Sequence, residues 1–439
     1  MPALGYVQYS IDTQKDSHKE TADKKVLENK YYTIEVEENG SLTIVDKANN
    51  VTYKNQGILV ENGDDGDSFN YSPPRKDMEV FSNESKCTVK ISGSDIYDQA
   101  EIHFDMVVPA DLDERAEGKV SVTMLVDMTV ALRKDSKVID FNVKVDNKGL
   151  SHRLCVLFDS QIVSAFNYAD QQFGLIKRPN YYEKEMKLYM ESMNNKTEKK
   201  AGIQELANWA NDQSTWQEPP ISIEPTQSYV SLTDGKTGIA VIPQGVREYE
   251  VLDDSKIRLT LFRTYGFMGK ENLIYRPGRA SGERIIETPA AQLLKEMEFN
   301  FGFTSYAGDI NDSDIDTLAK QYNTNLEVYT YAEFLNGRLI FSQREIEGQN
   351  AKIHSLFETE GNLVVSAVKK AEEDDGYIIR LYNGKDHKDL DVKIMFNFDI
   401  KEAYYTNLKE EKTEEIKVEN NTISVKELSH CKFVTIWVK

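Results

Sequence analysis

Six histidines are the first candidates for chemistry, because imidazole serves both as a metal ligand and as an acid–base group. They are His18, His103, His152, His354, His387 and His430. Two of them open H-x-D triplets, at residues 103–105 and 387–389, and on a strand such a pair projects to one face. Zinc needs further ligands, and no paired-histidine spacing supplies them. We therefore expect structural or solvated histidines, with His103 on a strand and His152 and His387 in turns.

Motifs for other chemistries are missing from the sequence. It contains no G-x-S-x-G nucleophile elbow, no phosphate loop and no dinucleotide fingerprint. Glycosidases need only two well-placed carboxylates, which leave no local spacing signature. Local motifs therefore neither establish nor exclude catalysis.

An acidic loop at residues 62–74 reads NGDDGDSFNYSPP and is dense in oxygen ligands. No glutamate closes it at the position that an EF-hand requires, which disfavours calcium. Aspartate and glycine could also stand here only because turns favour them. A polar loop with aromatic residues suits sugar hydroxyls and a pyranose face, so Asp64, Asp67 and Tyr71 are candidate sugar contacts.

A cationic segment follows a predicted strand near the middle of the chain. Residues 263–270 read RTYGFMGK and residues 276–279 read RPGR. The planar donor fork of arginine suits vicinal hydroxyls or carboxylates. A solvated loop whose cations pair with nearby acids is the alternative.

Strands must position these loops, since a period of two dominates the chain. Residues 31–36 and 41–45 alternate on either side of the turn Asn39-Gly40, which predicts a hairpin. The same period recurs at residues 119–130, 138–145, 228–232, 257–262 and 296–303. Many strands with few helical stretches favour an antiparallel sandwich over alternating strand–helix units.

Interruptions of this pattern divide the chain. Residues 181–210 predict an excursion with some helix, and residues 312–322 a short helix capped near Asp312, Ser313 or Asp314. Strand-like residues 4–9 lack a neighbouring strand, so we expect them to end a preceding sheet. The expected divisions are an end strand with linker at 1–20, a large sandwich at 21–305, a connecting helix and linker at 306–338, and a small sandwich at 339–439.

Composition narrows the partners and the compartment. Lys plus Arg number 53 and Asp plus Glu 73, a net charge of −20, which repels nucleic acid and anionic lipid surfaces. Three cysteines show no paired spacing, and Cys155 lies in an apolar run typical of a buried thiol. No segment resembles a membrane span or a signal peptide. A cytoplasmic protein is expected.

Several segments, taken in order, resemble glycoside hydrolase family 38, which includes α-mannosidases and mannosylglycerate hydrolases. The acidic loop is similar to the family's GDEYxYSPP stretch, and the cationic segment also has a counterpart. The resemblance covers almost the whole chain and is further carried by residues 2–6, 27–29, 173–174, 178–179, 216–219, 227–230, 234–235, 238–241, 245–251, 281–282, 288–292, 365–373 and 376–383.

What the resemblance implies is a mainly β fold, a galactose-mutarotase-like antiparallel super-sandwich followed by a small C-terminal β-sandwich. Enzymes of the family are zinc-dependent retaining α-mannosidases. Their zinc ligands and nucleophile lie in an N-terminal α/β domain and a helical bundle, which have no counterpart here. We therefore expect no catalytic residue and no metal ligand in this chain. An arginine and a tyrosine from this half approach the sugar in the family; Arg263 matches the arginine, and Tyr265 is the nearest tyrosine.

The resulting expectation is the C-terminal β portion of an enzyme, inactive alone and partnered by its N-terminal catalytic domain. The implied substrate is an α-mannoside oligosaccharide or mannosylglycerate, and family habit adds a homodimer. A non-catalytic carbohydrate-binding or scaffolding protein remains an alternative. So does another super-sandwich enzyme: an aldose epimerase, which requires a His–Glu pair in its cleft, or a lyase, which normally adds a helical toroid.

Overall fold

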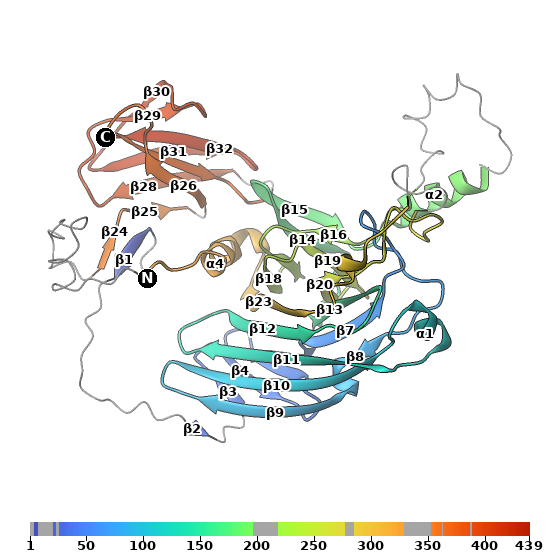
Figure 1. The fold of residues 1–439 in the computed structure, drawn as a ribbon. Helices are drawn as coiled ribbons and strands as arrows, with labels where there is room; N and C mark the ends of the chain where they lie inside the picture. The colour runs from blue at the N-terminus through green and yellow to red at the C-terminus, as the bar shows by residue number, and fades with distance from the viewer. Residues whose placement is uncertain are drawn as a thin grey trace, which may run out of the picture. The chain divides into compact units, whose positions relative to one another are not determined.

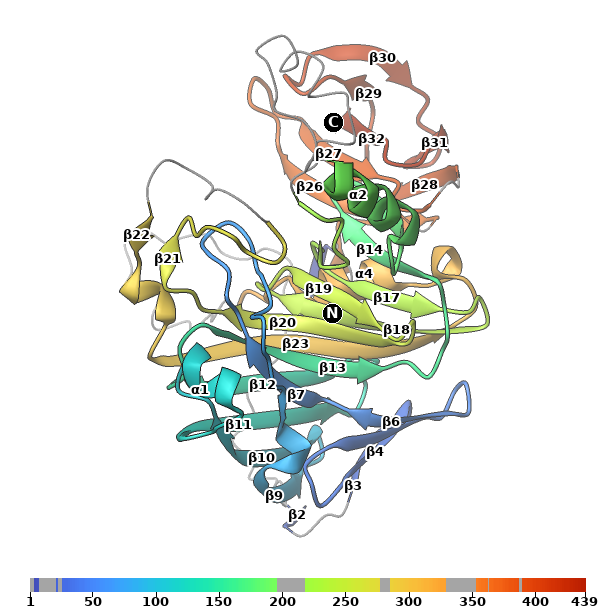
Figure 2. The same ribbon diagram turned by 90° about the vertical axis from the view of Figure 1, so that its right-hand side faces the viewer.

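The computed structural model describes residues 4–7, 21–22, 26–195, 218–276, 285–328, 353–361, 363–386 and 389–439. These residues form two compact units. Unit 1 comprises Met1–Ser17, Gln171–Leu175 and Asp314–Lys439, and unit 2 comprises His18–Asp170 and Ile176–Ser313. Figure 1 and Figure 2 show both as stacks of strands with few helices.

A ten-stranded sheet forms one layer of unit 2. Its order is β15 (Gly174–Pro179), β14 (Phe166–Gln171), β17 (Val230–Thr233), β18 (Thr237–Gln244), β23 (Glu296–Ala307), β12 (Ile139–Asp146), β11 (Val122–Arg133), β10 (Tyr97–Val108), β9 (Lys86–Gly93) and β2 (Thr21–Ala22). Alternation buries one face: Ile102 and Phe104 of β10 are in the core, whereas Glu101 is exposed. Residues on β10 and β11 pair in antiparallel register, with Ile102 opposite Met128.

Two smaller sheets supply the facing layer. A six-stranded sheet has the order β16 (Glu224–Pro225), β19 (Glu248–Leu252), β20 (Lys256–Arg263), β13 (His152–Asp159), β7 (Ile58–Gly63) and β8 (Val80–Phe81). A four-stranded sheet joins β3 (Val26–Glu28), β4 (Tyr32–Val36), β5 (Leu42–Asp46) and β6 (Val51–Gln56). Stacked phenylalanines fill the core, with Phe141 and Phe301 centroids 5.2 Å apart.

The small sandwich of unit 1 has its own core. Its three-stranded sheet is β25 (Phe357–Glu360), β28 (Leu390–Phe396) and β31 (Thr422–Leu428). Its five-stranded sheet is β26 (Val364–Lys370), β27 (Tyr377–Tyr382), β32 (Phe433–Val438), β29 (Ala403–Thr406) and β30 (Lys412–Ile416). The two sheets bury Phe357, Leu381, Ile394 and Ile436 between them.

Short elements complete the two units. The described helices are α1 (Leu112–Glu117), α2 (Glu183–Asn195) and α4 (Ile315–Tyr322), with single 3-10 turns at Ser82–Glu84, Pro289–Gln292 and Ile310–Asp312. Two-stranded ribbons join β1 (Gly5–Val7) to β24 (Ile353–Ser355) and β21 (Phe267–Met268) to β22 (Ile286–Glu287). No helix in the described ranges is long and apolar enough to cross a membrane.

These observations confirm the predicted fold class, an antiparallel super-sandwich followed by a small β-sandwich. The hairpin at Asn39-Gly40 is present, and Gly40 adopts the positive φ of 81° that the turn requires. Helix α2 lies in the predicted excursion, whose residues 196–210 are outside the described ranges, and Asp314 stands at the N-cap of α4.

Two local expectations were wrong. Strand β1 has a partner within this chain, because Gly5, Tyr6 and Val7 pair with residues of β24. His152 does not lie in a turn but opens β13 and is buried. The division at residues 20, 305 and 338 stays a prediction.

Candidate functional site

Sheet order brings the acidic loop and the cationic segment together. Strands β7 and β20 both pair antiparallel with β13, which lies between them. They therefore run parallel to each other, and the loops that follow them leave the same edge of the sheet. Figure 2 shows the blue loop after β7 beside the yellow loop after β20. Almost 200 residues of sequence separate these neighbours.

Three ion pairs join the two loops. Arg263 Nε donates to Asp64 Oδ2 at 2.6 Å, Lys270 Nζ pairs with Asp65, and Arg276 pairs with Asp67. Asp64 and Asp67 are almost completely buried. We call this assembly, residues 64–72 with residues 263–276, the loop clasp. These ion pairs show that the three aspartates stabilise the structure of the two loops.

Every backbone N–H from residue 64 to residue 70 is hydrogen bonded, although none of these residues belongs to a strand or helix. The acceptors are Ser151 O, Ser72 O, Asp64 Oδ1, Asn70 O, Phe267 O and, for both Phe69 and Asn70, Asp67 Oδ1. A loop whose donors are all bonded loses little by leaving water. The acidic loop is thus held in one conformation.

Burial and charge act in opposition on the two buried aspartates. Burial raises the pKa of the Asp64 carboxyl, against the pull of Arg263. Burial also acts upward on Asp67, but the bonds from Arg276 and from the amides of Lys270, Asn70 and Phe69 outweigh it, and the pKa of Asp67 is lowered. Neither carboxylate is free to meet a ligand.

Arg263 keeps a limited capacity for binding. Its Nη2 also donates to Asp67 O and Asn70 O, both at 2.9 Å. Its Nη1 has no hydrogen bond among the described residues, and the side chain is 19% exposed. Tyr265 is half-buried, with the Arg263 guanidinium carbon 5.3 Å from its ring centroid. The structure thus brings Arg263 and Tyr265 together and leaves one donor nitrogen free.

Tyr71 points inward rather than toward solvent. Its hydroxyl accepts a hydrogen bond from Asn62 at 3.1 Å, and its ring lies over Arg153 and edge-on to Tyr275. Tyr71 is only 7% exposed. It therefore supports the loop from below, which is a different role from the expected sugar contact.

Phe69 is the residue that the sequence reasoning missed. It is 60% exposed, more than any other aromatic side chain of the described residues. Its own amide and that of Asn70 both donate to Asp67 Oδ1, so an apolar ring is presented to solvent on a hydrogen-bonded backbone. An exposed aromatic ring offers an apolar face with a defined geometry for contact with a ligand. The sequence signal was an aromatic residue between aspartates and prolines.

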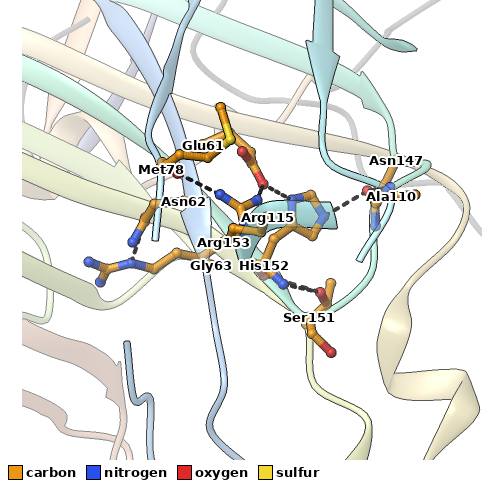
Figure 3. Close-up of polar contacts among 12 residues, drawn as sticks. Glu61, Asn62, Gly63, Met78, Ala110, Arg115, Asn147, Ser151, His152 and Arg153 are labelled. Carbon is orange, nitrogen blue, oxygen red and sulfur yellow. Dashed lines mark hydrogen bonds and ion pairs between the residues drawn. The ribbon is translucent and has the colours of Figure 1, made fainter. Parts of the chain in front are cut away.

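A buried polar network is centred on Glu61 of strand β7 (Figure 3). His152 Nδ1 contacts Glu61 Oε1 at 2.9 Å and its Nε2 contacts Asn147 Oδ1 at 2.9 Å, while Arg115 also pairs with Glu61. Sequence spacing gave no hint of this network, since its members come from β7, α1, β13 and the segment that follows β12. The epimerase alternative requires such a His–Glu pair, but these two side chains are at most 1% exposed and cannot reach a sugar.

The other histidines that the structure describes do not assemble a metal site. His103 is on strand β10 as expected and pairs with Asp127 at 2.6 Å and Asp105 at 3.2 Å. His18 and His387 are outside the described ranges. Among the residues described, no group of three His, Cys, Asp or Glu side chains could hold a metal ion. They do not fit the zinc that the family resemblance implies.

Comparisons with known proteins agree with this architecture. Residues 27–267 match the model of the glycosyl hydrolases family 38 C-terminal domain, and residues 362–435 match that of the family 38 C-terminal beta sandwich domain. A Halalkalibacterium halodurans protein named "Putative mannosylglycerate hydrolase" is 24% identical over 420 residues, which are 91% of this chain and 40% of that protein.

Two crystal structures from Enterococcus faecalis share the fold. One is a protein of glycosyl hydrolase family 38, 20% identical, with a TM-score of 0.71 over 97% of this chain and 45% of the other. The second is an alpha-mannosidase from strain V583, 21% identical, with a TM-score of 0.71 over 94% of this chain and 42% of the other.

Fold and matches together define a β-sandwich portion of a glycoside hydrolase. More particularly, the chain belongs to glycoside hydrolase family 38 and carries the C-terminal domains of that family. It spans less than half the length of the relatives that it matches.

Proposed function

We propose that this chain is the β portion of a zinc-dependent retaining α-mannosidase that hydrolyses terminal α-mannosides. The zinc and the nucleophile would be held by a preceding catalytic domain of the same enzyme, since the described residues gather no metal ligands. The lengths of the relatives support this division, because each is more than twice as long as its match to this chain. Assembly with that domain, and with a second copy of the chain, belongs to the same proposal.

The observation that carries the proposal is Phe69. Its ring is exposed on a loop whose neighbouring amides are all bonded, and the Arg263 nitrogen without a partner belongs to the same clasp. Sugars bind through the apolar face of a pyranose and through hydrogen bonds to hydroxyls. A rigid aromatic beside guanidinium donors offers both contacts. The clasp would therefore form part of the wall that contacts the substrate.

The substrate class follows from the family and from charge. The relatives' names include an alpha-mannosidase and a mannosylglycerate hydrolase, so an α-mannoside oligosaccharide or mannosylglycerate is the proposed substrate. A net charge of −20 opposes nucleic acid and anionic membranes as partners. Three free cysteines fit the reducing cytoplasm as the compartment.

Two measurements test the proposal. The purified 439-residue chain should not hydrolyse an aryl α-mannoside, with or without added zinc; turnover by the pure chain would refute the assignment of catalysis to another domain. In the enzyme that includes the preceding domain, Phe69→Ala should lower kcat/KM by about tenfold, because it removes an aromatic contact worth roughly 1–2 kcal/mol.

Phe166→Ala is the matched control, since Phe166 is also an exposed aromatic of unit 2, at 43%, but lies on β14 rather than in the clasp. It should leave kcat/KM unchanged. Equal kinetics for Phe69→Ala and the unmodified enzyme would remove the clasp from the sugar site.

A further inference from the structure

We propose that Arg153 is a positioning residue for the loop clasp: its guanidinium fixes Tyr71, and through Tyr71 it aligns both loops. That the aligned loops contact a sugar rests on the proposed function. The alignment itself does not, and it can be measured without any sugar.

Arg153 lies on strand β13, between β7 and β20 of the six-stranded sheet, and its side chain makes three contacts. Its Nε donates to Asn62 Oδ1 at 3.0 Å and its Nη2 donates to Glu250 Oε1 at 2.9 Å. Its guanidinium carbon lies 3.9 Å from the centroid of the Tyr71 ring. The side chain is only 2% exposed. A planar cation stacked on an aromatic face and bonded at two edges has a single orientation.

Tyr71 carries this order into both loops. Its hydroxyl is bonded by Asn62, which Arg153 also holds, so the tyrosine is fixed at its face and at its tip. The Tyr275 ring packs edge-on to Tyr71 with centroids 6.0 Å apart, and the Tyr275 amide donates to Ser72 Oγ at 3.3 Å. Arg153, Tyr71 and Tyr275 therefore connect strand β13 to the acidic loop and then to the cationic segment.

Stability alone does not explain an arginine at this position. Its Nη1 is buried without a hydrogen-bond partner among the described residues. Replacing both partners of a buried ion pair by apolar residues often leaves stability unchanged or raises it, and loss of one partner is costly mainly where the other charge is left unpaired. Glu250 would not be left unpaired, because Arg258 Nε also donates to it at 2.7 Å. The planar stack on Tyr71 is what an apolar side chain could not reproduce.

Arg258 supplies the matched control. It is a buried arginine of the same cluster and pairs with Glu250 and Glu79, but it has no hydrogen bond or stacking contact with Asn62 or Tyr71. In the 439-residue chain, Arg153→Met should speed hydrogen exchange of the amides of residues 64–70 by about tenfold or more relative to strands β10 and β11. Arg258→Met should leave the exchange of residues 64–70 relative to β10 and β11 unchanged. Arg153→Lys should exchange as fast in this loop as Arg153→Met does.

The proposal is overturned if both methionine variants loosen the loop equally, if neither does, or if lysine restores protection. Should Arg153→Met fail to fold, Tyr71→Leu removes the same stack from the loop side and must give the same local loosening. Tyr71→Phe keeps the ring and should retain most of the protection.

Kinetics in the enzyme with its preceding domain separate the two proposals. Arg153→Met should raise KM by about tenfold with a smaller change in kcat, because the clasp would bind substrate rather than react with it. Faster exchange without a change in KM would contradict the sugar-contacting role of the clasp and leave the positioning role intact. Unchanged exchange in Arg153→Met, together with impaired kinetics in Phe69→Ala, would contradict the positioning role of Arg153 and leave the sugar-contacting role of the clasp intact.

Discussion

Removal of the positive charge of Arg263 tests the ion pairs of the clasp directly. Arg263→Met keeps most of the volume of the side chain but leaves Asp64, which is 1% exposed, without its cation. It also removes the donor to the carbonyl oxygens of Asp67 and Asn70. Asp64→Asn, alone and combined with Arg263→Met, completes a double-mutant cycle.

The magnitude follows from the stranded carboxylate. A buried ion pair that loses one partner typically costs about 3–5 kcal/mol of unfolding free energy. The two carbonyl oxygens add less, because the part-exposed position admits water. Since whole domains are stable by only about 5–15 kcal/mol, we expect Arg263→Met to weaken unit 2 severely. The double variant should recover roughly 2–3 kcal/mol of the loss, because no unpaired charge remains.

Urea unfolding followed by circular dichroism measures these free energies, and hydrogen exchange of residues 58–72 shows whether unit 2 is the part affected. The effect should also depend on pH. Burial already raises the pKa of Asp64, and the loss of Arg263 removes the largest influence that lowers it, leaving the Gly66 amide and the charge of Arg153. A raised carboxyl pKa favours the folded state at low pH, so the deficit of Arg263→Met should grow as pH rises from about 4 to 8.

A loss below about 1 kcal/mol at pH 7, or a double variant no more stable than Arg263→Met, would refute this reasoning. The first result would mean that the ion pair is weak in solution. The second would mean that Arg263 and Asp64 contribute independently to the free energy of unfolding.

Two further predictions concern the fold itself. Phe301→Ala should lower the free energy of unfolding by about 3–5 kcal/mol in urea titrations, because Phe301 is fully buried and stacks on Phe141; a loss below about 1 kcal/mol would contradict its place in the core. Hydrogen bonding to Asp127 raises the pKa of His103. The imidazolium therefore stabilises the fold below about pH 6.5 and ceases to do so as pH rises through its folded pKa. The thermal midpoint of wild type should fall relative to that of His103→Gln between pH 6 and pH 9, and parallel curves would rule this out.

Much of the strand content was predictable because burial on one face leaves a local trace. Alternation located β11 and β12 to within a few residues, since every second side chain of each strand enters the core. The predicted strands at 257–262 and 296–303 also match β20 and β23, although β20 and the middle of β23 are buried on both faces. The turn at Asn39-Gly40 was equally local. His152 was misplaced because a polar residue at a strand end carries no such trace, and its partners lie on other elements.

The candidate site was only half visible in the sequence. Both loops stood out by composition, and Arg263 and Asp64 were named as candidate sugar contacts, which stays a prediction. Their pairing was not predictable, nor was the inward orientation of Tyr71 or the exposure of Phe69. Each of these depends on which side of a loop faces the sheet below it.

By itself the sequence determined the all-β fold class, the principal strands and the two loops with unusual chemistry, and its ordered segments indicated the family. Only the tertiary structure decided that aspartates 64, 65 and 67 meet Arg263, Lys270 and Arg276. Side-chain periodicity records which face of a strand is buried, but it does not record which strand lies beside it. Here the position of β13 between β7 and β20 places two distant loops on one edge, and that order is a property of the assembled sheet.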